Sequence, residues 1–508
     1  MSWFWEKEKE QAPQVEANYV VSNPIVVQSF DGEKNPGEIG LAKNYKSDFK
    51  VLSVRSWQSY FESEVTQTII NKYSLWMVGS GLKLQSLPIT NVIEANGFSI
   101  DKNSYTKNIE TFFKLFVDSE RSDYSGKQSL NKRAETVFKN SRISGDVLVI
   151  LRFDGKQMTV QMIDSSHVRT PFGYDRKSEL KGKNIVDGVE LNLKGGVEAY
   201  HLLKKDGTFD RIEAKDSKGR KVAFLVFGKQ YRENDTRGMS DISVMLETIA
   251  KLDRYKEATV AGAEERQKVA YTIEHDSTST GENPMTRQIS SSINGGNSSC
   301  EVDSFDSCET LKQDIAFTSE KDVYNMPVGA KMKSLESKSE LYFKDFYDTN
   351  FQHACAAIGI PPDVAMSLYN SSYSASRAAI KDWEHILKVG RKEFADQFYK
   401  PVFSYWLDVM VLSGKIKIPG YLEALENDNF DLLDSYKHAR FIGANVPHID
   451  PLKEVKAERA KLGNLSPNVP LTTVEAAIER LDGGDFENIS EQFQDEIKGY
   501  EEEEEITE

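Results

Sequence analysis

Side chains that could carry out catalysis or hold a metal ion are scattered along this 508-residue sequence rather than grouped. His353 and Cys355 stand two residues apart in a helical pattern, so they point to different faces of the helix and cannot share a metal ion. No Gly-Lys pair is followed by the Ser or Thr of a phosphate-binding loop, and no HExxH, GxSxG or EF-hand pattern occurs. We therefore expect no catalytic residues, no metal site and no cofactor, and we do not expect an enzyme.

One stretch with a different chemistry is SLYNSSYSASR, residues 367–377. Its hydroxyl and amide groups can hydrogen-bond a phosphate without carrying a charge themselves. Its only basic side chain, Arg377, stands at the edge, where the pattern of a long amphipathic helix begins. Taken by itself, this pattern favours a flexible surface loop ahead of a helix.

The composition limits the class of protein. The length predicts two to four packed regions, and 39% hydrophobic with 28% charged residues is ordinary for a soluble protein. The formal net charge of −15 speaks against a protein that clamps nucleic acid by neutralising phosphates, although it does not exclude passing contact with DNA. No apolar run approaches the length of a membrane span, and we expect no signal peptide. The three cysteines form no CxxC pair and fit a reducing compartment.

The elements that must position the hydroxyl-rich stretch follow a recognisable order. Residues 50 to 230 mix helical and strand patterns: one helix is predicted from Ser56 to the glycines at 79–81, and two hairpins turn at Asp154-Gly155 and Asp206-Gly207. This region predicts an α+β fold.

A long helical stripe then starts after Ser240, a candidate N-cap, and a weakly patterned insert occupies residues 275–330. A second helix is predicted from a capping box at Ser337–Glu340 to Gly359. After the hydroxyl-rich stretch comes a third, long helix with a kink expected at Pro401, and the last eighty residues have helical patterns ahead of an acidic tail.

Several of these segments, in the same order, resemble the portal proteins of tailed bacteriophages, specifically the lambda-type family. The segments are Arg-Gly-Met-Ser at 237–240, Ile-Pro-Pro at 360–362, Tyr-Ser-x-Ser-Arg at 373–377 and Ile-Asp-Pro-x-Lys-Glu at 449–454. The resemblance runs from about residue 50 to about residue 495, and the motifs are specific jointly rather than singly.

The resemblance implies an order of regions along the chain. These regions are an N-terminal arm (1–45), an α+β wing (46–238), a first stem helix (239–271), a clip (272–334), a second stem helix (335–360), a tunnel loop (361–376), a long tunnel helix (377–413), a C-terminal helical wing or crown region (414–490) and an acidic disordered tail (491–508).

The resemblance also implies a function as a conduit. Many copies would form a ring, expected to be a dodecamer, at one capsid vertex, and double-stranded DNA would pass through it without sequence-specific contacts. The implied partners are the large terminase of the packaging motor, the major capsid protein and the head–tail connector, with no membrane partner. The protein would reside in the virion and, during assembly, in the host cytoplasm.

The resemblance assigns the tunnel loop to the DNA channel. Its candidate channel residues are Tyr369, Asn370, Ser371, Ser372, Tyr373 and Ser374. Four lysines near the second stem helix are either a solvent-exposed face or a basic ring facing the channel: Lys331, Lys333, Lys338 and Lys344. The alternatives to a conduit are a capsid scaffold or head–tail adaptor that does not line a channel, and a nuclease, which would need clustered carboxylates.

Overall fold

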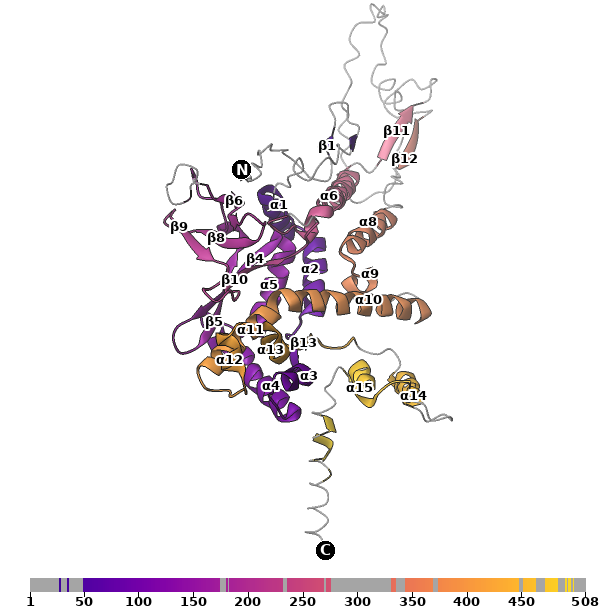
Figure 1. The fold of residues 1–508 in the computed structure, drawn as a ribbon. Coiled ribbons are helices and arrows are strands. Elements are labelled where there is room, and N and C mark those ends of the chain that lie inside the picture. The colour runs from indigo at the N-terminus through magenta and orange to yellow at the C-terminus, as the bar shows by residue number, and fades with distance from the viewer. Residues whose placement is uncertain are drawn as a thin grey trace, which may run out of the picture. The chain divides into compact units, whose positions relative to one another are not determined.

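The computed structural model combines helices with small antiparallel sheets, so the predicted α+β class is confirmed (Figure 1). The chain divides into two compact units, residues 1–251 with 349–508 and residues 252–348. The described residues are 27–28, 34–35, 49–173, 180, 182–231, 235–268, 271–275, 330–334, 343–368, 373–446, 451–462, 471–482, 489–490, 492–494 and 497.

The first unit contains a group of helices from the N-terminal half of the chain. These are α1 (Phe49–Glu62), α2 (Glu64–Met77), α3 (Thr90–Ala95), α4 (Lys102–Asp118) and α5 (Leu130–Ser144), preceded by the two-residue strands β1 (Val27–Gln28) and β2 (Lys34–Asn35). The prediction of one helix from Ser56 onward was wrong, because Ser63 is extended (φ −104°, ψ 122°) and separates α1 from α2. Ile69 and Tyr73 of α2 are buried, whereas Phe61 of α1 is 69% exposed.

Two sheets pack against each other in this unit and share one apolar core. The three-stranded sheet has the order β10-β4-β5 and the four-stranded sheet the order β6-β7-β8-β9. The strands are β4 (Asp146–Phe153), β5 (Met158–Asp164), β6 (Asn184–Val186), β7 (Val189–Leu191), β8 (Val197–Leu203), β9 (Phe209–Glu213) and β10 (Ala223–Phe227). Both predicted hairpins are confirmed, with Gly155 and Gly207 at positive φ in the turns. Leu148, Tyr200 and Leu225 belong to the buried core.

The C-terminal half of the chain returns to the same unit. Its elements are α9 (Pro362–Met366), α10 (Tyr373–Phe394), a π-helical turn (Ala395–Tyr399), α11 (Lys400–Leu412), α12 (Tyr421–Glu426), α13 (Phe430–Lys437), β13 (Ala439–Ile442), α14 (Pro451–Lys461) and α15 (Val474–Asp482). β13 pairs with β3 (Lys83–Ser86), which joins the two halves of the chain. Edge-to-face contacts of Phe113 with Phe403 and Trp406 reinforce that junction.

The long helix differs in detail from the prediction. It begins at Tyr373, before the expected start at residue 377, and α9 lies within the expected tunnel loop. The irregularity expected at Pro401 is a π-helical turn just ahead of it. Because proline lacks a backbone N–H, the wider turn lets the helix continue without the hydrogen bond that Pro401 cannot donate. Pro451, of the Ile-Asp-Pro-x-Lys-Glu motif, is the first residue of α14.

The second unit contains parts of two helices and one described ribbon. α6 (Leu246–Lys268) enters it from the first unit, β11 (Tyr271–His275) pairs antiparallel with β12 (Ala330–Ser334), and α8 (Phe343–Ile358) leaves it. Within this unit the ring of Tyr255 lies 5.6 Å from that of Phe343 and 4.5 Å from that of Phe346. The predicted capping box at 337–340 and most of the predicted clip lie outside the described residues.

Candidate functional site

The predicted channel residues fall at the junction between α9 and α10. Tyr369, Asn370, Ser371 and Ser372 lie outside the described residues, so their predicted role remains a prediction. Tyr373 and Ser374 are the first residues of α10 rather than loop residues. The structure therefore defines the two ends of the segment 369–372.

The N-terminal end of this segment is attached to α2. Ser367 closes α9 in the left-handed conformation, with φ +57°, and its hydroxyl accepts a hydrogen bond from Lys72 Nζ at 2.9 Å. The amide of Leu368 donates to the carbonyl of Asp363 at 3.0 Å. These contacts fix the direction in which the chain leaves α9.

The C-terminal end is attached to the same helix through α10. Trp383 is fully buried, and its ring lies 6.0 Å from that of Tyr73 on α2. The two helices approach closely at Gly390, where an added Cβ would lie 2.5 Å from Met77 Cε. Arg391 donates to the carbonyls of Trp76 and Met77 at the end of α2, at 2.7 and 3.1 Å. The residue that ends α9 is thus bonded to α2, and α10 packs on α2 from Trp383, ten residues beyond its first residue, Tyr373.

The predicted lysines are distributed over different elements. Lys331 and Lys333 lie in β12, opposite Glu274 and Thr272 of β11. Lys344 is an exposed residue near the start of α8, and Lys338 lies outside the described residues. The role of these lysines in a channel therefore stays a prediction.

The Arg-Gly-Met-Ser motif forms a buried junction that the sequence did not reveal. The guanidinium of Arg237 donates to both carboxylate oxygens of Asp146, at 2.7 and 2.8 Å. It also donates to the backbone carbonyls of Ser165, Val168 and Asp187, between 2.8 and 3.0 Å. Both charged side chains are buried, so this pair joins the start of β4 to the segment that leads into α6.

The next residues of the motif complete the junction. The amide of Gly238 donates to Asp146 at 3.0 Å, and a Cβ at this glycine would lie 2.0 Å from the carbonyl oxygen of Gly145. Ser240 was predicted to be an N-cap. Its side chain caps a 3-10 turn, Asp241–Val244, which precedes α6. A signal for the pair existed in the sequence, since Asp146 is an acid at the start of the apolar strand DVLVIL.

Within the described residues, no group of three or more His, Cys, Asp and Glu side chains could hold a metal ion. None of the described helices is long and apolar enough to cross a membrane.

Comparison with solved structures returned matches of low identity. Two of them cover 86% of this chain at 9% identity: a virion of a native gene transfer agent (GTA) particle (TM-score 0.40, 93% of that chain) and the neck of an empty GTA particle computed with C6 symmetry (TM-score 0.42, 94% of that chain). A third, the neck of a native GTA particle computed with C12 symmetry, covers 80% of this chain and 97% of its own at 11% identity, with a TM-score of 0.36. At TM-scores this low we draw no conclusion about this chain from these structures.

The family comparison is decisive. The model of the phage portal protein, lambda family, matches residues 32–389. That range includes the Arg237–Asp146 junction, α6, α8 and the segment between α9 and α10. Because it covers well over half of the sequence, the chain belongs to the lambda family of phage portal proteins.

Proposed function

We propose that copies of this protein close into a ring through which double-stranded DNA enters and leaves a phage capsid, with residues 369–374 facing the DNA. The observation that carries the proposal is the family match over residues 32–389, which includes this segment. The ring, its expected dodecameric state and the residence in the virion are parts of the same proposal.

The anchoring of the segment supports this role. A loop that borders a moving duplex must keep its position. Ser367, just before this loop, is bonded to Lys72 of α2, and the helix that follows the loop packs on α2 at Trp383. Its hydroxyl and amide groups can contact phosphates without adding ionic affinity. A lysine in each copy would add affinity for a duplex that carries one charge per ~1.7 Å, and the ring would then slow the DNA.

The stem helix offers a surface for a neighbouring copy. After Leu252, which is buried, most of the described residues of α6 are exposed in the single chain, and Val260 is 53% exposed. Small exposed residues such as Ala258 and Ala261 allow another helix to approach closely. A long helix with so little of its surface covered within one chain is well suited to pack in a ring.

The partners follow from the regions that the family assigns. The clip, predicted at 272–334, would dock the terminase during packaging and the head–tail connector afterwards, and the crown region would lie inside the capsid. We propose that the protein itself catalyses nothing and that a separate motor supplies the force for packaging.

Assembly is the first experimental test. The mass of the purified full-length protein and negative-stain images of it should show a closed ring with a central hole. A protein that remains a monomer or a dimer under packaging conditions would count against the conduit and favour a scaffold or adaptor.

The channel segment needs a separate test. Ser371→Lys combined with Ser372→Lys should reduce DNA packaging in an assembly reaction while leaving the ring intact, and added salt should relieve part of the defect because it weakens phosphate contacts. The matched control is Ser99→Lys with Ser104→Lys, at two exposed serines of the first unit. Normal packaging by the Ser371/Ser372 variant would remove these residues from the channel wall.

A further inference from the structure

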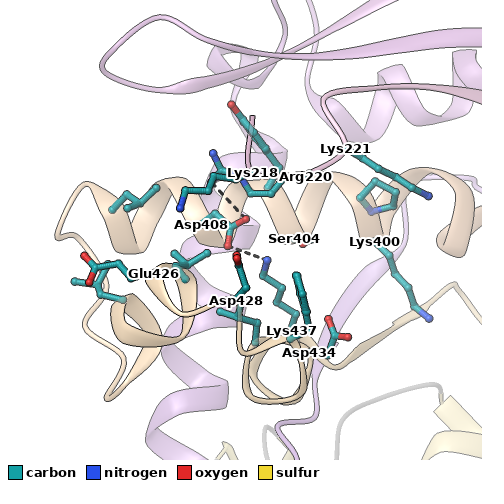
Figure 2. A pocket seen from close by; sticks show the side chains of 18 of the residues that line it. Lys218, Arg220, Lys221, Lys400, Ser404, Asp408, Glu426, Asp428, Asp434 and Lys437 are labelled. Carbon is teal, nitrogen blue, oxygen red and sulfur yellow. Dashed lines mark ion pairs between the residues drawn. The ribbon is translucent and has the colours of Figure 1, made fainter. Parts of the chain in front are cut away.

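A cleft of about 620 Å³ lies beside α11, and none of the residues that line it belongs to α9 or α10 (Figure 2). Its floor is α11, where Lys400, Ser404, Asp408 and Leu412 recur every fourth residue and so share one face of the helix. Its walls are the turn Lys218–Lys221 between β9 and β10 and the helices α12 and α13. We call it the α11 cleft. Its volume falls in the range of roughly 300–1,000 Å³ that is typical of binding sites.

The α11 cleft is held open by a buried ionic network. Asp408 is 1% exposed, and its carboxylate accepts a hydrogen bond from the Tyr421 hydroxyl at 2.6 Å and pairs with Lys437 Nζ at 2.8 Å. Arg220 of the β9–β10 turn lies 3.7 Å from the other carboxylate oxygen, and Asp216 holds Arg220 at 2.7 Å. The network ties the turn, α11, α12 and α13 together, so the cleft exists before any occupant arrives.

The walls expose apolar side chains that a folded chain ordinarily covers. Leu412 is 58% exposed, Leu422 is 49% exposed and Phe430 is 63% exposed, and all three line the α11 cleft. Large apolar side chains gathered in one exposed concavity are typical of a surface that receives a partner segment.

The charges of the α11 cleft are separated onto two lips. Figure 2 shows Lys218 and Lys221 on one side of α11 and Glu426, Asp428 and Asp434 on the other. All five side chains are exposed, and within the described part of the chain they have no ion pair with one another or with any neighbour. An occupant that satisfies both lips must present negative charge on one side and positive charge on the other.

One segment of this chain outside the described residues has that pattern. Residues 3–9 read Trp-Phe-Trp-Glu-Lys-Glu-Lys, three aromatic residues followed by strictly alternating charges. In an extended chain successive side chains point to opposite sides, so Glu6 and Glu8 lie on one side while Lys7 and Lys9 lie on the other. Seventeen residues separate Lys9 from Val27, the first residue of β1, and can span up to roughly 60 Å.

We propose that the segment Trp3–Lys9 of this protein occupies the α11 cleft in an extended conformation. The aromatic side chains cover the apolar wall, the glutamates face Lys218 and Lys221, and the lysines face the lip formed by α12 and α13. The acidic C-terminal segment, residues 499–508, matches only the basic lip and would be repelled by the other one. This inference does not depend on the DNA channel, so the two proposals can fail separately.

Photochemical crosslinking of the full-length protein tests the inference directly. Phe4 is replaced by the photoreactive p-benzoylphenylalanine, the protein is illuminated, and the crosslinked residues are mapped by mass spectrometry. The expected partners are residues of the β9–β10 turn, α11, α12 or α13. Crosslinks that map only to other surfaces would overturn the proposal.

Charge reversal provides the second readout. Lys218→Glu with Lys221→Glu should lower the crosslink yield at the α11 cleft severalfold, since exposed charge pairs are each worth about 0.2–1 kcal/mol and tenfold corresponds to about 1.4 kcal/mol. Adding Glu6→Lys with Glu8→Lys in the same chain should restore the yield. An unchanged yield in the first variant, or no restoration in the second, would contradict the assigned orientation.

Two controls separate this pattern from general charge effects. Lys102→Glu with Lys114→Glu changes two exposed lysines of α4 and should leave the yield unchanged. Lys7→Glu with Glu8→Lys preserves the composition and net charge of the segment but destroys the alternation, and it should lower the yield. If this last variant crosslinked as well as the parent, the alternation of charges would not be what the α11 cleft recognises.

Discussion

The buried pair of Arg237 and Asp146 allows a quantitative prediction about the junction between the β-sheets and the first long helix. The guanidinium makes five hydrogen bonds, two to the carboxylate and three to backbone carbonyls. It also lies 4.1 Å from the centre of the Phe49 ring. Removing one partner of such a pair leaves an uncompensated buried charge, which typically costs about 3–5 kcal/mol.

The test is a double-mutant cycle with Arg237→Met, Asp146→Asn and the combination. Each single change is expected to lower the free energy of unfolding by roughly 3–5 kcal/mol, and the double variant should lose clearly less than the sum because no charge is then left alone. Arg237→Lys should fall between the parent and Arg237→Met, because lysine keeps the charge but lacks the planar fork that reaches Asp146 and the carbonyls together.

Urea unfolding provides the free energies. Hydrogen exchange of peptides covering residues 140–150 and 235–245 shows whether the loss is local to the junction. A cost below about 1 kcal/mol for Arg237→Met, or single costs that simply add, would refute the view that the motif is a coupled structural junction.

Two further predictions concern the first compact unit, residues 1–251 with 349–508. Gly238→Ala should destabilise it by about 1–3 kcal/mol or more in urea unfolding, because its Cβ would lie 2.0 Å from the Gly145 carbonyl oxygen, whereas Gly262→Ala, with no atom within 4 Å, should be neutral or slightly stabilising. The hydrogen bond from Arg211 is the main cause that lowers the pKa of Glu190 to about 2 from its ordinary value of 4.5, so its ionised form stabilises the fold above pH 4.5. That contribution, at most about 3 kcal/mol, should be lost as the pH falls towards 2, and Glu190→Gln should flatten this part of the urea-midpoint profile; an unchanged profile would contradict the assignment.

Local signals in the sequence predicted local structure well. The Asp-Gly pairs at 154–155 and 206–207 form the two hairpin turns because glycine tolerates the positive φ that such turns require. Ser240 caps the turn ahead of α6, and Gly359 ends α8 at φ +88°. Each of these outcomes depends on a few neighbouring residues.

Features that depend on distant residues were not predictable in the same way. Asp146 and Arg237 stand 91 residues apart in the sequence, and Asp408 joins segments from two halves of the chain, so neither pair has a spacing that marks it. The division of the first predicted helix at Ser63 was missed because the apolar spacing of four continues across the break. The role of residues 369–372 was inferred from the family resemblance alone, since a run of hydroxyls has no single structural meaning.

The most direct test of the central claim is an electron cryomicroscopy map of the assembled full-length protein. The account predicts a closed ring in which the segment 369–372, between α9 and α10, borders the central channel. A map that shows this segment on the outer surface, or an assembly with no axial opening, would contradict it.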